Sequence, residues 1–201
     1  LELSGSPILM RTLETFANAQ NKINIILVLP SEHFALWREM CAIHNFSVHH
    51  TIAEGGSTRF QSVKSGLAQI ENTKGLVAVH DGVRPIVCES LIEKVFNEAF
   101  SHGNAVPVVP VVDSLRKVEG KKNFPVPREE FRIVQTPQCF QTAILKEAFK
   151  QTESAAFTDE ASVVEAFGES INLVAGDPIN IKITNPADLI IAESCLSGIL
   201  S

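Results

Sequence analysis

The segment VAVHDGVRPIV, residues 77–87, joins an apolar run to a group of charged side chains. Its first residues are typical of a buried strand, and Asp81 and Arg84 follow directly after that strand. A buried strand has no need of an acid and a base at its carboxyl end, whereas a phosphate or metal site does. His80, beside Asp81, is more typical of a packed core histidine than of a ligand. The segment therefore predicts a sheet whose edge carries a binding site.

Strand and helix patterns alternate on both sides of this segment. Apolar or alternating runs predict strands at residues 23–29, 46–53, 75–80, 104–112, 171–176 and 179–184. Periods near 3.6 predict helices at residues 8–19, 32–44, 57–70, 89–102, 141–152, 158–168 and 185–200, the last with Asn185 as N-cap and Pro186 at its first position. This alternation predicts an α/β fold with one mostly parallel, doubly wound sheet.

Residues 113–137 interrupt the alternation. They carry six of the seventeen Lys and Arg residues, show no helical period, and contain a turn signal, EGKKN, between two strand-like runs. A solvated surface loop is one interpretation, but a structureless connection of this length is uncommon in a compact domain. We predict a projecting β-arm at about residues 112–137. Because such an arm cannot bury itself, we expect it to pack against a second copy of the chain in a homodimer.

Composition limits the class of partner. A chain of 201 residues with 45% hydrophobic residues predicts one domain spanning residues 1–201. The net charge of −6 gives no general attraction for nucleic acid or for an anionic membrane, so we expect neither as a partner. The chain shows no signal peptide, no apolar run near the ~20 residues that span a bilayer, and no closely spaced cysteine pair. These features predict a cytoplasmic protein that binds a small molecule.

Three stretches place polar side chains where ligands of such sheets bind, outside the carboxyl ends of the strands. In EGGSTRFQSV, Gly55 and Gly56 allow close backbone approach, while Arg59 and Ser62 can face one ligand from the next helix. An ordinary strand-to-helix turn explains this stretch equally well. In the opening segment, Asp81 suits Mg²⁺ and Arg84 suits phosphate, although a structural Asp–Arg pair is the alternative. In INIKIT, Lys182 alternates with two apolar neighbours and could reach a phosphate.

Five motifs together carry a resemblance to a known family. EGGSTRFQSV, VHDGVRP, QTPQCF, FTDEAS and NIKITNPADL, in this order and spacing, resemble the 2-C-methyl-D-erythritol 4-phosphate cytidylyltransferase family from Leu1 to about Cys195. The resemblance implies a fold of the nucleotide-diphospho-sugar transferase type and a transferase of the non-mevalonate isoprenoid pathway. It implies attack of methylerythritol phosphate on the α-phosphorus of CTP, with release of pyrophosphate.

The resemblance also implies roles for individual residues. Asp81, Arg84 and Lys182 would be catalytic, with Asp81 holding Mg²⁺. The nucleotide would be bound by Gly55, Gly56, Arg59, Ser62 and Gly82. The acceptor would be bound by Arg84, Ser114, Arg128, Thr158 and Lys182. Ser114 and Arg128 lie on the arm and would reach into the site of the neighbouring subunit.

Two departures and two alternatives qualify this interpretation. The family begins with a strand and a glycine-rich loop that carries an arginine and then a lysine, and we expect this segment to precede Leu1. Ile179 stands where relatives often carry an acid, and Asp177 is a candidate substitute. A ribitol 5-phosphate cytidylyltransferase and a non-catalytic nucleotide-binding homologue remain alternatives. A dinucleotide-dependent dehydrogenase is disfavoured because no GxGxxG follows a predicted strand.

Overall fold

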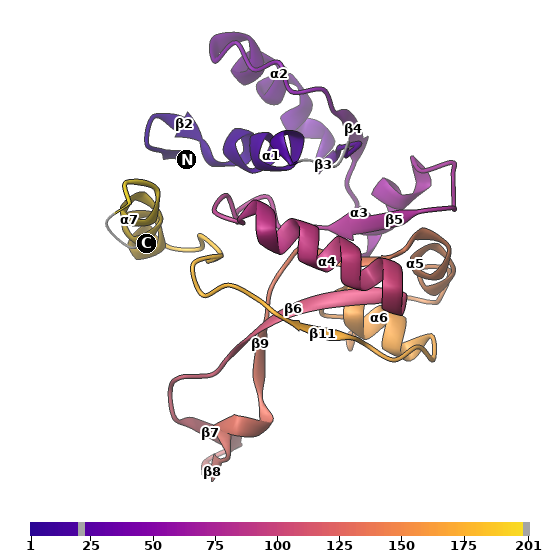
Figure 1. Ribbon diagram of the computed structural model, residues 1–201, viewed down its shortest axis with the longest axis vertical. Coiled ribbons are helices and arrows are strands. Elements are labelled where there is room, and N and C mark those ends of the chain that lie inside the picture. The colour runs from indigo at the N-terminus through magenta and orange to yellow at the C-terminus, as the bar shows by residue number, and fades with distance from the viewer. Residues whose placement is uncertain (20–22, 199–201) are drawn as a thin grey trace.

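The computed structural model describes residues 1–19 and 23–198 and shows helices on both sides of a central sheet (Figure 1). The helices are α1 (Ile8–Asn18), α2 (Phe34–Ile43), α3 (Arg59–Ala68), α4 (Glu89–His102), α5 (Thr142–Ala148), α6 (Glu160–Ala166) and α7 (Pro186–Leu196), with short 3-10 helices at Ser31–His33 and Arg128–Glu130. The strands are β1 (Glu2–Leu3), β2 (Ser6–Pro7), β3 (Ile26–Leu29), β4 (Thr51–Glu54), β5 (Leu76–Val79), β6 (Asn104–Pro110), β7 (Leu115–Glu119), β8 (Lys122–Val126), β9 (Arg132–Val134), β10 (Gln138–Gln141) and β11 (Leu173–Ala175). The α/β class is confirmed.

Strand directions in the central sheet are mixed among the described residues, whereas the sequence pattern predicted mostly parallel pairing. Its strand order is β11-β6-β10-β5, and β9 also pairs with β6. Strand β11 runs parallel to β6, as β3 does to β4 in a separate two-stranded sheet, but β10 is antiparallel to both of its neighbours. The physical reason is the arm: the chain leaves along β6 and returns along β9, so β10 enters the sheet in the opposite direction.

Alternate residues of the sheet strands pack on opposite faces, as the period of a strand requires. Cys139 of β10 and Ala105 of β6 pack with α4, whereas their successors Phe140 and Val106 pack with α5 and α6. All four residues are fully buried. The sheet is therefore covered on both faces, which confirms the doubly wound arrangement.

Two expected strand segments are not strands. Residues 46–50 and 179–184 show alternating apolar residues, yet the structure has no ladder at either place. Phe46 and Val48 pack around Trp37, while Ile181 and Ile183 pack in a cluster with Leu3 and Ile8. The alternation in both segments therefore reflects packing of irregular backbone against the core.

The last helix begins as the sequence predicts. The Asn185 side chain accepts hydrogen bonds from the backbone N–H groups of Ala187 and Asp188, and Pro186 is the first helical residue. The helix ends at Leu196, and residues 199–200 of its predicted span lie outside the described residues. None of the described helices has the length and apolar character that crossing a membrane requires.

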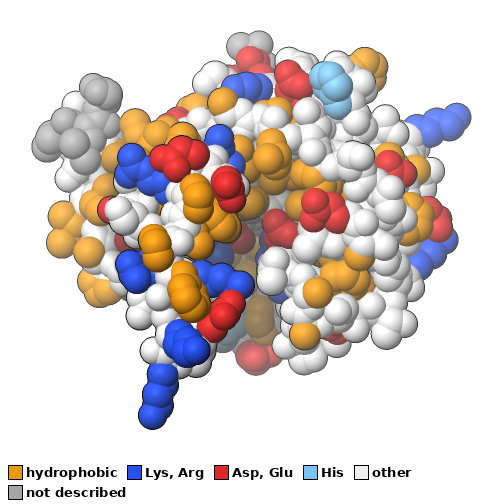
Figure 2. All heavy atoms as spheres, turned by 90° about the horizontal axis from the view of Figure 1, so that it is seen from below, with side chains coloured by type: hydrophobic (Ala, Val, Ile, Leu, Met, Phe, Trp, Pro, Cys, Tyr) orange, Lys and Arg blue, Asp and Glu red, His pale blue; other side chains and the backbone are white. Residues whose placement is uncertain are grey.

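The expected arm is present as β structure. Strands β7 and β8 form an antiparallel hairpin that projects from the sheet in Figure 1, and Gly120 takes a positive φ of 61° in its turn. Several hydrophobic side chains of the arm are exposed: Val118, Phe124, Phe131 and Ile133. Figure 2 views the molecule from the end where the arm projects and shows hydrophobic and charged side chains mixed on that face.

Candidate active site

Asp81, Arg84 and Lys182 meet at the carboxyl end of β5. Oδ2 of Asp81 lies 3.2 Å from Nε of Arg84 and 3.3 Å from Nζ of Lys182. The Asp81 and Arg84 side chains are 16% and 10% exposed, whereas that of Lys182 is 47% exposed. Burial would raise the pKa of Asp81, but Lys182 and Arg84 hold it below its ordinary value. The structure thus brings together three residues that the sequence predicted to share one rim.

A chain of hydrogen bonds fixes the backbone around this cluster. The Asp81 N–H donates to Oγ1 of Thr136 at 3.1 Å, and this hydroxyl lies 3.1 Å from Nδ1 of His80. Nε2 of His80 lies 3.0 Å from the carbonyl oxygen of Arg84. Because a carbonyl oxygen can only accept, Nε2 carries the ring proton and donates a hydrogen bond to it. Burial lowers the pKa of His80 to about 4, although the Arg84 carbonyl and Asp81 act in the opposite direction. His80 is therefore neutral at physiological pH and serves as a structural link.

Arg84 is also held from the opposite side. Its Nη1 donates to the carbonyl oxygen of Asn180 at 2.7 Å, and Nδ2 of Asn180 donates to the carbonyl oxygen of Thr136 at 2.8 Å. Asn180 is fully buried, and none of the described residues supplies a hydrogen bond to its Oδ1. The guanidinium of Arg84 consequently has a fixed orientation, while the more exposed Lys182 can move toward a ligand.

The glycine-rich turn lies between β4 and α3. A Cβ on Gly56 would approach Cβ of Gln61 to 2.3 Å, so no larger residue fits there without a shift. The Gly56 N–H donates to Oγ of Ser62 at 3.1 Å, and Thr58 caps α3 by accepting from the Gln61 N–H. Gly55 and Ser62 are close as well, since a Cβ on Gly55 would lie 3.2 Å from that hydroxyl. The turn is folded tightly against the start of α3.

Arg59 and Gly82, two of the predicted nucleotide-binding residues, already have structural partners. Both terminal nitrogens of Arg59 donate to the buried carboxylate of Glu160. The Gly82 carbonyl accepts from Oγ1 of Thr12 at 2.9 Å, and a Cβ on Gly82 would lie 2.8 Å from Leu9. Neither contact contradicts a role in binding, and those roles stay predictions.

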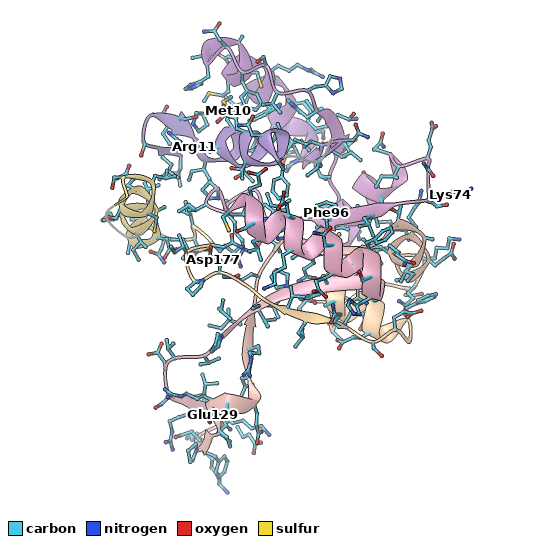
Figure 3. All side chains as sticks on the ribbon, in the orientation of Figure 1. Met10, Arg11, Lys74, Phe96, Glu129 and Asp177 are labelled. Carbon is cyan, nitrogen blue, oxygen red and sulfur yellow. The ribbon has the colours of Figure 1, made fainter. Side chains whose placement is uncertain are left out.

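The described hydrogen bonds of Thr158 and Arg128 are made to groups outside the Asp81 cluster. Thr158 is exposed just before α6, and its N–H donates to Oγ of Ser162 at 3.0 Å. Ser114 and Arg128 are exposed on the arm, where Arg128 donates to the Val112 carbonyl. Figure 3 labels Glu129, the neighbour of Arg128, on the projecting part of the molecule. Within this single chain the arm residues do not join the cluster.

Asp177, the candidate substitute for the acid missing at Ile179, is held by its own structural contacts, and its role stays a prediction. Its Oδ1 accepts from the Ile179 N–H at 2.9 Å, and its Oδ2 lies 3.5 Å from Sγ of Cys88. Within the described residues no group of three or more His, Cys, Asp or Glu side chains forms a metal site.

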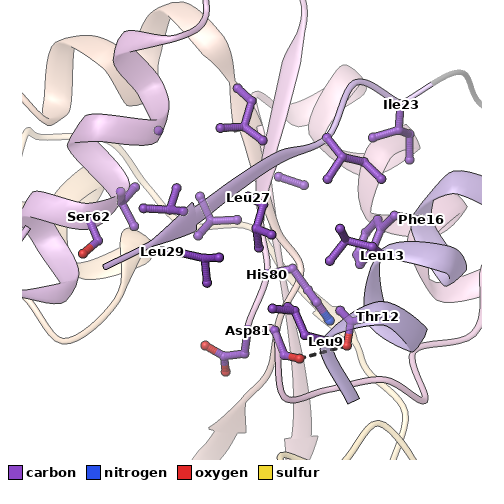
Figure 4. Close-up of a pocket in the computed structure, with 18 of the residues that line it drawn as sticks. Leu9, Thr12, Leu13, Phe16, Ile23, Leu27, Leu29, Ser62, His80 and Asp81 are labelled. Carbon is purple, nitrogen blue, oxygen red and sulfur yellow. Dashed lines mark hydrogen bonds between the residues drawn. The ribbon is translucent and has the colours of Figure 1, made fainter. Parts of the chain in front are cut away.

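An apolar groove of about 1350 Å³ runs between β3 and β5 and ends beside Ser62 and Asp81 (Figure 4). Leu27, Leu29 and Phe16 are among the apolar residues that line it. In the part of the chain that the structure describes, β3 pairs only with β4 and β5 only with β10. Each of these two strands therefore has one edge without a strand partner, and the groove separates the two edges.

Thr136, Asn180 and Glu160 hydrogen-bond to predicted site residues, and the sequence did not single them out. Thr136 lies in the motif QTPQCF and Asn180 immediately precedes Ile181 in NIKIT, but nothing in either segment indicates burial. Glu160 follows the N-cap Asp159, a place where acids are common on solvated helices. The contacts that reveal these residues join segments 44 to 101 positions apart.

Comparison with known proteins identifies the family. The family model of 2-C-methyl-D-erythritol 4-phosphate cytidylyltransferase (IspD) matches residues 1–198. Proteins of that name from Bacteroides fragilis and Phocaeicola vulgatus are 47% and 46% identical to this chain; the alignments cover 98% and 96% of it and 89% and 88% of the relatives. The crystal structure of the Thermus thermophilus protein of that name has a TM-score of 0.82 and 36% identity, covering 98% of this chain and 92% of that one.

These matches extend over nearly the whole chain. They include the segments that carry Asp81, Arg84 and Lys182. The chain belongs to the 2-C-methyl-D-erythritol 4-phosphate cytidylyltransferase family.

Proposed function

We propose that this protein transfers the cytidylyl group of CTP to 2-C-methyl-D-erythritol 4-phosphate in isoprenoid biosynthesis, with release of pyrophosphate. The observation that carries the proposal is the convergence of Asp81, Arg84 and Lys182 at the end of β5 in a chain of this family. A phosphate oxygen of the acceptor attacks the α-phosphorus of CTP. The bond from that phosphorus to the oxygen bridging to the β-phosphorus breaks, and pyrophosphate leaves.

The main task of the protein in such a transfer is to align two phosphorylated molecules and to stabilise the negative charge on their oxygens. Arg84 supplies a cation whose direction is fixed by Asp81 and Asn180. Lys182 supplies a second cation that is half exposed and able to reach a phosphate. Asp81 keeps both cations at the rim, and we assign all three to catalysis, with Arg84 and Lys182 also binding the acceptor phosphate.

Asp81 also fits a magnesium ion. Mg²⁺ is commonly held by one or two carboxylates together with substrate phosphates, and Asp81 is a partly buried carboxylate beside the predicted phosphate site. Both recorded ion pairs of this carboxylate involve Oδ2. When bound, the ion would neutralise charge on the triphosphate of CTP.

We assign the nucleotide to the glycine-rich turn. Gly55 and Gly56 lie in the turn before α3, Ser62 lies in the first turn of that helix, and the groove of Figure 4 joins Ser62 to the Asp81 end of β5. The tight turn leaves backbone close to any ligand that occupies this end. Gly82, next to Asp81, would lie beside the same ligand, and Thr158 would assist from the acceptor side.

The groove between β3 and β5 supports the expectation of an additional strand before Leu1. Two strand edges face an apolar space, and unpaired strand edges are ordinarily covered by pairing or by another element. A strand seated there would end near Ser62 and Asp81, which is where a following glycine-rich loop would meet a triphosphate. The groove is the observation that supports an additional strand at this place.

The arm supports a homodimer with shared sites. Exposed hydrophobic residues such as Phe124 and Ile133 would be covered by a second copy of the chain. Ser114 and Arg128 would then contribute to the acceptor site of the neighbouring subunit. The cytoplasmic location stays a prediction from the sequence.

Pyrophosphate release from CTP tests the function. With the purified protein and Mg²⁺, we expect turnover with methylerythritol phosphate and much slower turnover with ribitol 5-phosphate. Preference for ribitol 5-phosphate would replace the proposed acceptor by the alternative one. Binding of CTP without turnover of either acceptor would instead favour a non-catalytic nucleotide-binding homologue.

A further inference from the structure

Glu160 is a charged side chain with no exposed surface, and it lies outside the Asp81 cluster. Its Oε1 and Oε2 each accept a hydrogen bond from one terminal nitrogen of Arg59, and the second of these bonds measures 2.8 Å. Burial raises the pKa of the Glu160 carboxyl, while Arg59 acts to lower it. A buried carboxylate is tolerated when a partner of this kind is present. Arg59 is therefore the partner on which the burial of Glu160 depends.

The ion pair joins two segments that are far apart in the sequence. Arg59 is the first residue of α3 and follows the glycine-rich turn, whereas Glu160 is the first residue of α6 and follows Thr158 by two positions. The two residues are separated by 101 positions. The pair thus connects the segment assigned to the nucleotide with the segment assigned to the acceptor.

The Glu160 end of this connection is anchored to the central sheet. Gln138 of β10 is 1% exposed; its Nε2 donates to Oδ2 of Asp159 at 2.9 Å, and its Oε1 accepts from the Ala161 N–H at 3.0 Å. A capping box between Asp159 and Ser162 closes the first turn of α6. Residues on both sides of Glu160 are therefore held in place by contacts that do not involve Arg59.

The Arg59 end is the one that gains its orientation from the pair. The Arg59 side chain is 40% exposed, compared with 0% for Glu160. Burial would lower the pKa of Arg59, but its hydrogen bonds and attraction to Glu160, with smaller contributions from Asp81 and Asp159, raise it. A planar guanidinium bound through both terminal nitrogens has little freedom to rotate. The anchored acid accordingly sets the position of Arg59 and of the turn before it.

We infer that Glu160 is a positioning residue for the transfer reaction: through Arg59 it fixes the glycine-rich turn against the Thr158 segment and so sets the separation of nucleotide and acceptor. The inference rests on the proposed function. This positioning task competes with the predicted contact of Arg59 with CTP, and it uses one N–H of each terminal nitrogen, both donated to Glu160. The reaction requires close alignment of the attacking and leaving oxygens, so loss of the pair should act on kcat.

The test compares Glu160→Gln with Arg59→Lys and with the double variant. Glutamine keeps the shape of Glu160 but loses its charge and presents an N–H₂ group to one guanidinium nitrogen. Lysine keeps the charge of Arg59 but not its two-nitrogen fork, so Glu160 retains a counterion. This variant therefore tests the inference even if Glu160→Gln does not fold. Glu165→Gln, an exposed acid on the same helix, is the matched control.

We expect each single variant to lower kcat about 10- to 100-fold, while the dissociation constant of CTP alone changes less than about threefold. We expect the double variant to be no worse than the poorer single variant, because the two residues act as one unit. Glu165→Gln should match the wild type. A loss of thermal stability with unchanged kcat per folded site would overturn the inference and reduce the pair to a structural role.

Two other outcomes also count against it. If Arg59→Lys weakens CTP binding strongly and Glu160→Gln does not, Arg59 contacts the nucleotide directly and positioning by Glu160 is rejected. If the wild type shows no turnover with any acceptor, the proposed function fails and this inference fails with it. Normal turnover by the wild type and by Glu160→Gln rejects the inference alone.

Discussion

The Asp81 cluster and the β7–β8 arm are both rich in charge, but they hold it differently. In the cluster, Asp81 and Arg84 are largely buried and each has several polar partners. In the arm, the ion pair of Lys117 and Glu119 joins side chains that are 65% and 54% exposed. The contrast shows that the cluster is organised by the fold of one chain, whereas the arm has little to organise it unless a second copy covers it.

Removal of the central acid of the cluster should have the largest effect. In Asp81→Asn, Arg84 and Lys182 lose their shared counterion, and the proposed magnesium ligand is lost as well. We expect turnover to fall at least about 100-fold, as it does when a charge-stabilising group is removed from an active site. Pyrophosphate release measures the effect. Asp113→Asn, at the exposed base of the arm, is the control and should leave turnover nearly unchanged. Equal losses of turnover in the two variants would contradict the difference between the Asp81 cluster and the arm.

The second prediction concerns pH and His80. Its folded-state pKa of about 4 lies below the ordinary value of 6.5, so between these values the unfolded chain binds more protons than the native one. This contribution to stability is complete above pH 6.5 and is lost as the pH falls toward 4, amounting to about 3 kcal/mol. Urea denaturation at several pH values measures it.

Variants at two histidines isolate this contribution. His80→Gln lacks the titrating ring, so the free energy of unfolding should depend less on pH than in the wild type. His102→Gln, at an exposed site on α4, should keep the full dependence. The arm segment, residues 113–137, contains no histidine and so has no counterpart of His80. Identical slopes in the wild type and His80→Gln would contradict a neutral, buried His80.

The two regions also differ in what the sequence could predict. Asp81 and Arg84 were predictable because polar residues directly after a buried strand lie at the ligand-binding edge of a sheet. Lys182 was found for a partly wrong reason: its segment is irregular rather than a strand, yet Ile181 and Ile183 still pack inward and leave Lys182 facing Asp81. The segment packs its alternate residues as a strand would, although it is not a strand.

Contacts between residues far apart in the chain could not be predicted from the sequence. Thr136 reaches Asp81 from 55 positions away, and Glu160 reaches Arg59 from 101. No local pattern marks such pairs, because each depends on how the sheet closes. The antiparallel direction of β10 escaped the prediction for the same reason, since it follows from the path of the chain through the arm. The hairpin itself was predictable from its turn signal and its two short polar runs.

The third prediction tests whether the arm completes the site of a partner. Arg128→Ala should lower turnover about tenfold, the cost of one hydrogen bond to a charged ligand, and change the free energy of unfolding by less than about 0.5 kcal/mol. Its side chain is 48% exposed, so little packing is lost. Mixing Arg128→Ala with Asp81→Asn subunits should restore roughly a quarter of wild-type turnover, because half of the dimers then contain one intact site. Absence of any recovery would argue for sites built within one chain.

The smallest effect is expected at Lys117, within the exposed ion pair of β7. Nζ of Lys117 lies 2.6 Å from Oε1 of Glu119, but exposed pairs of this kind contribute little because water and salt screen them. Lys117→Ala should change the free energy of unfolding by less than about 0.5 kcal/mol, measured by urea denaturation at two protein concentrations. A larger loss at both concentrations would mean that the arm is stabilised within its own chain, as the Asp81 cluster is. A loss that appears only at the higher concentration would place Lys117 in the contact between subunits, because only association depends on concentration.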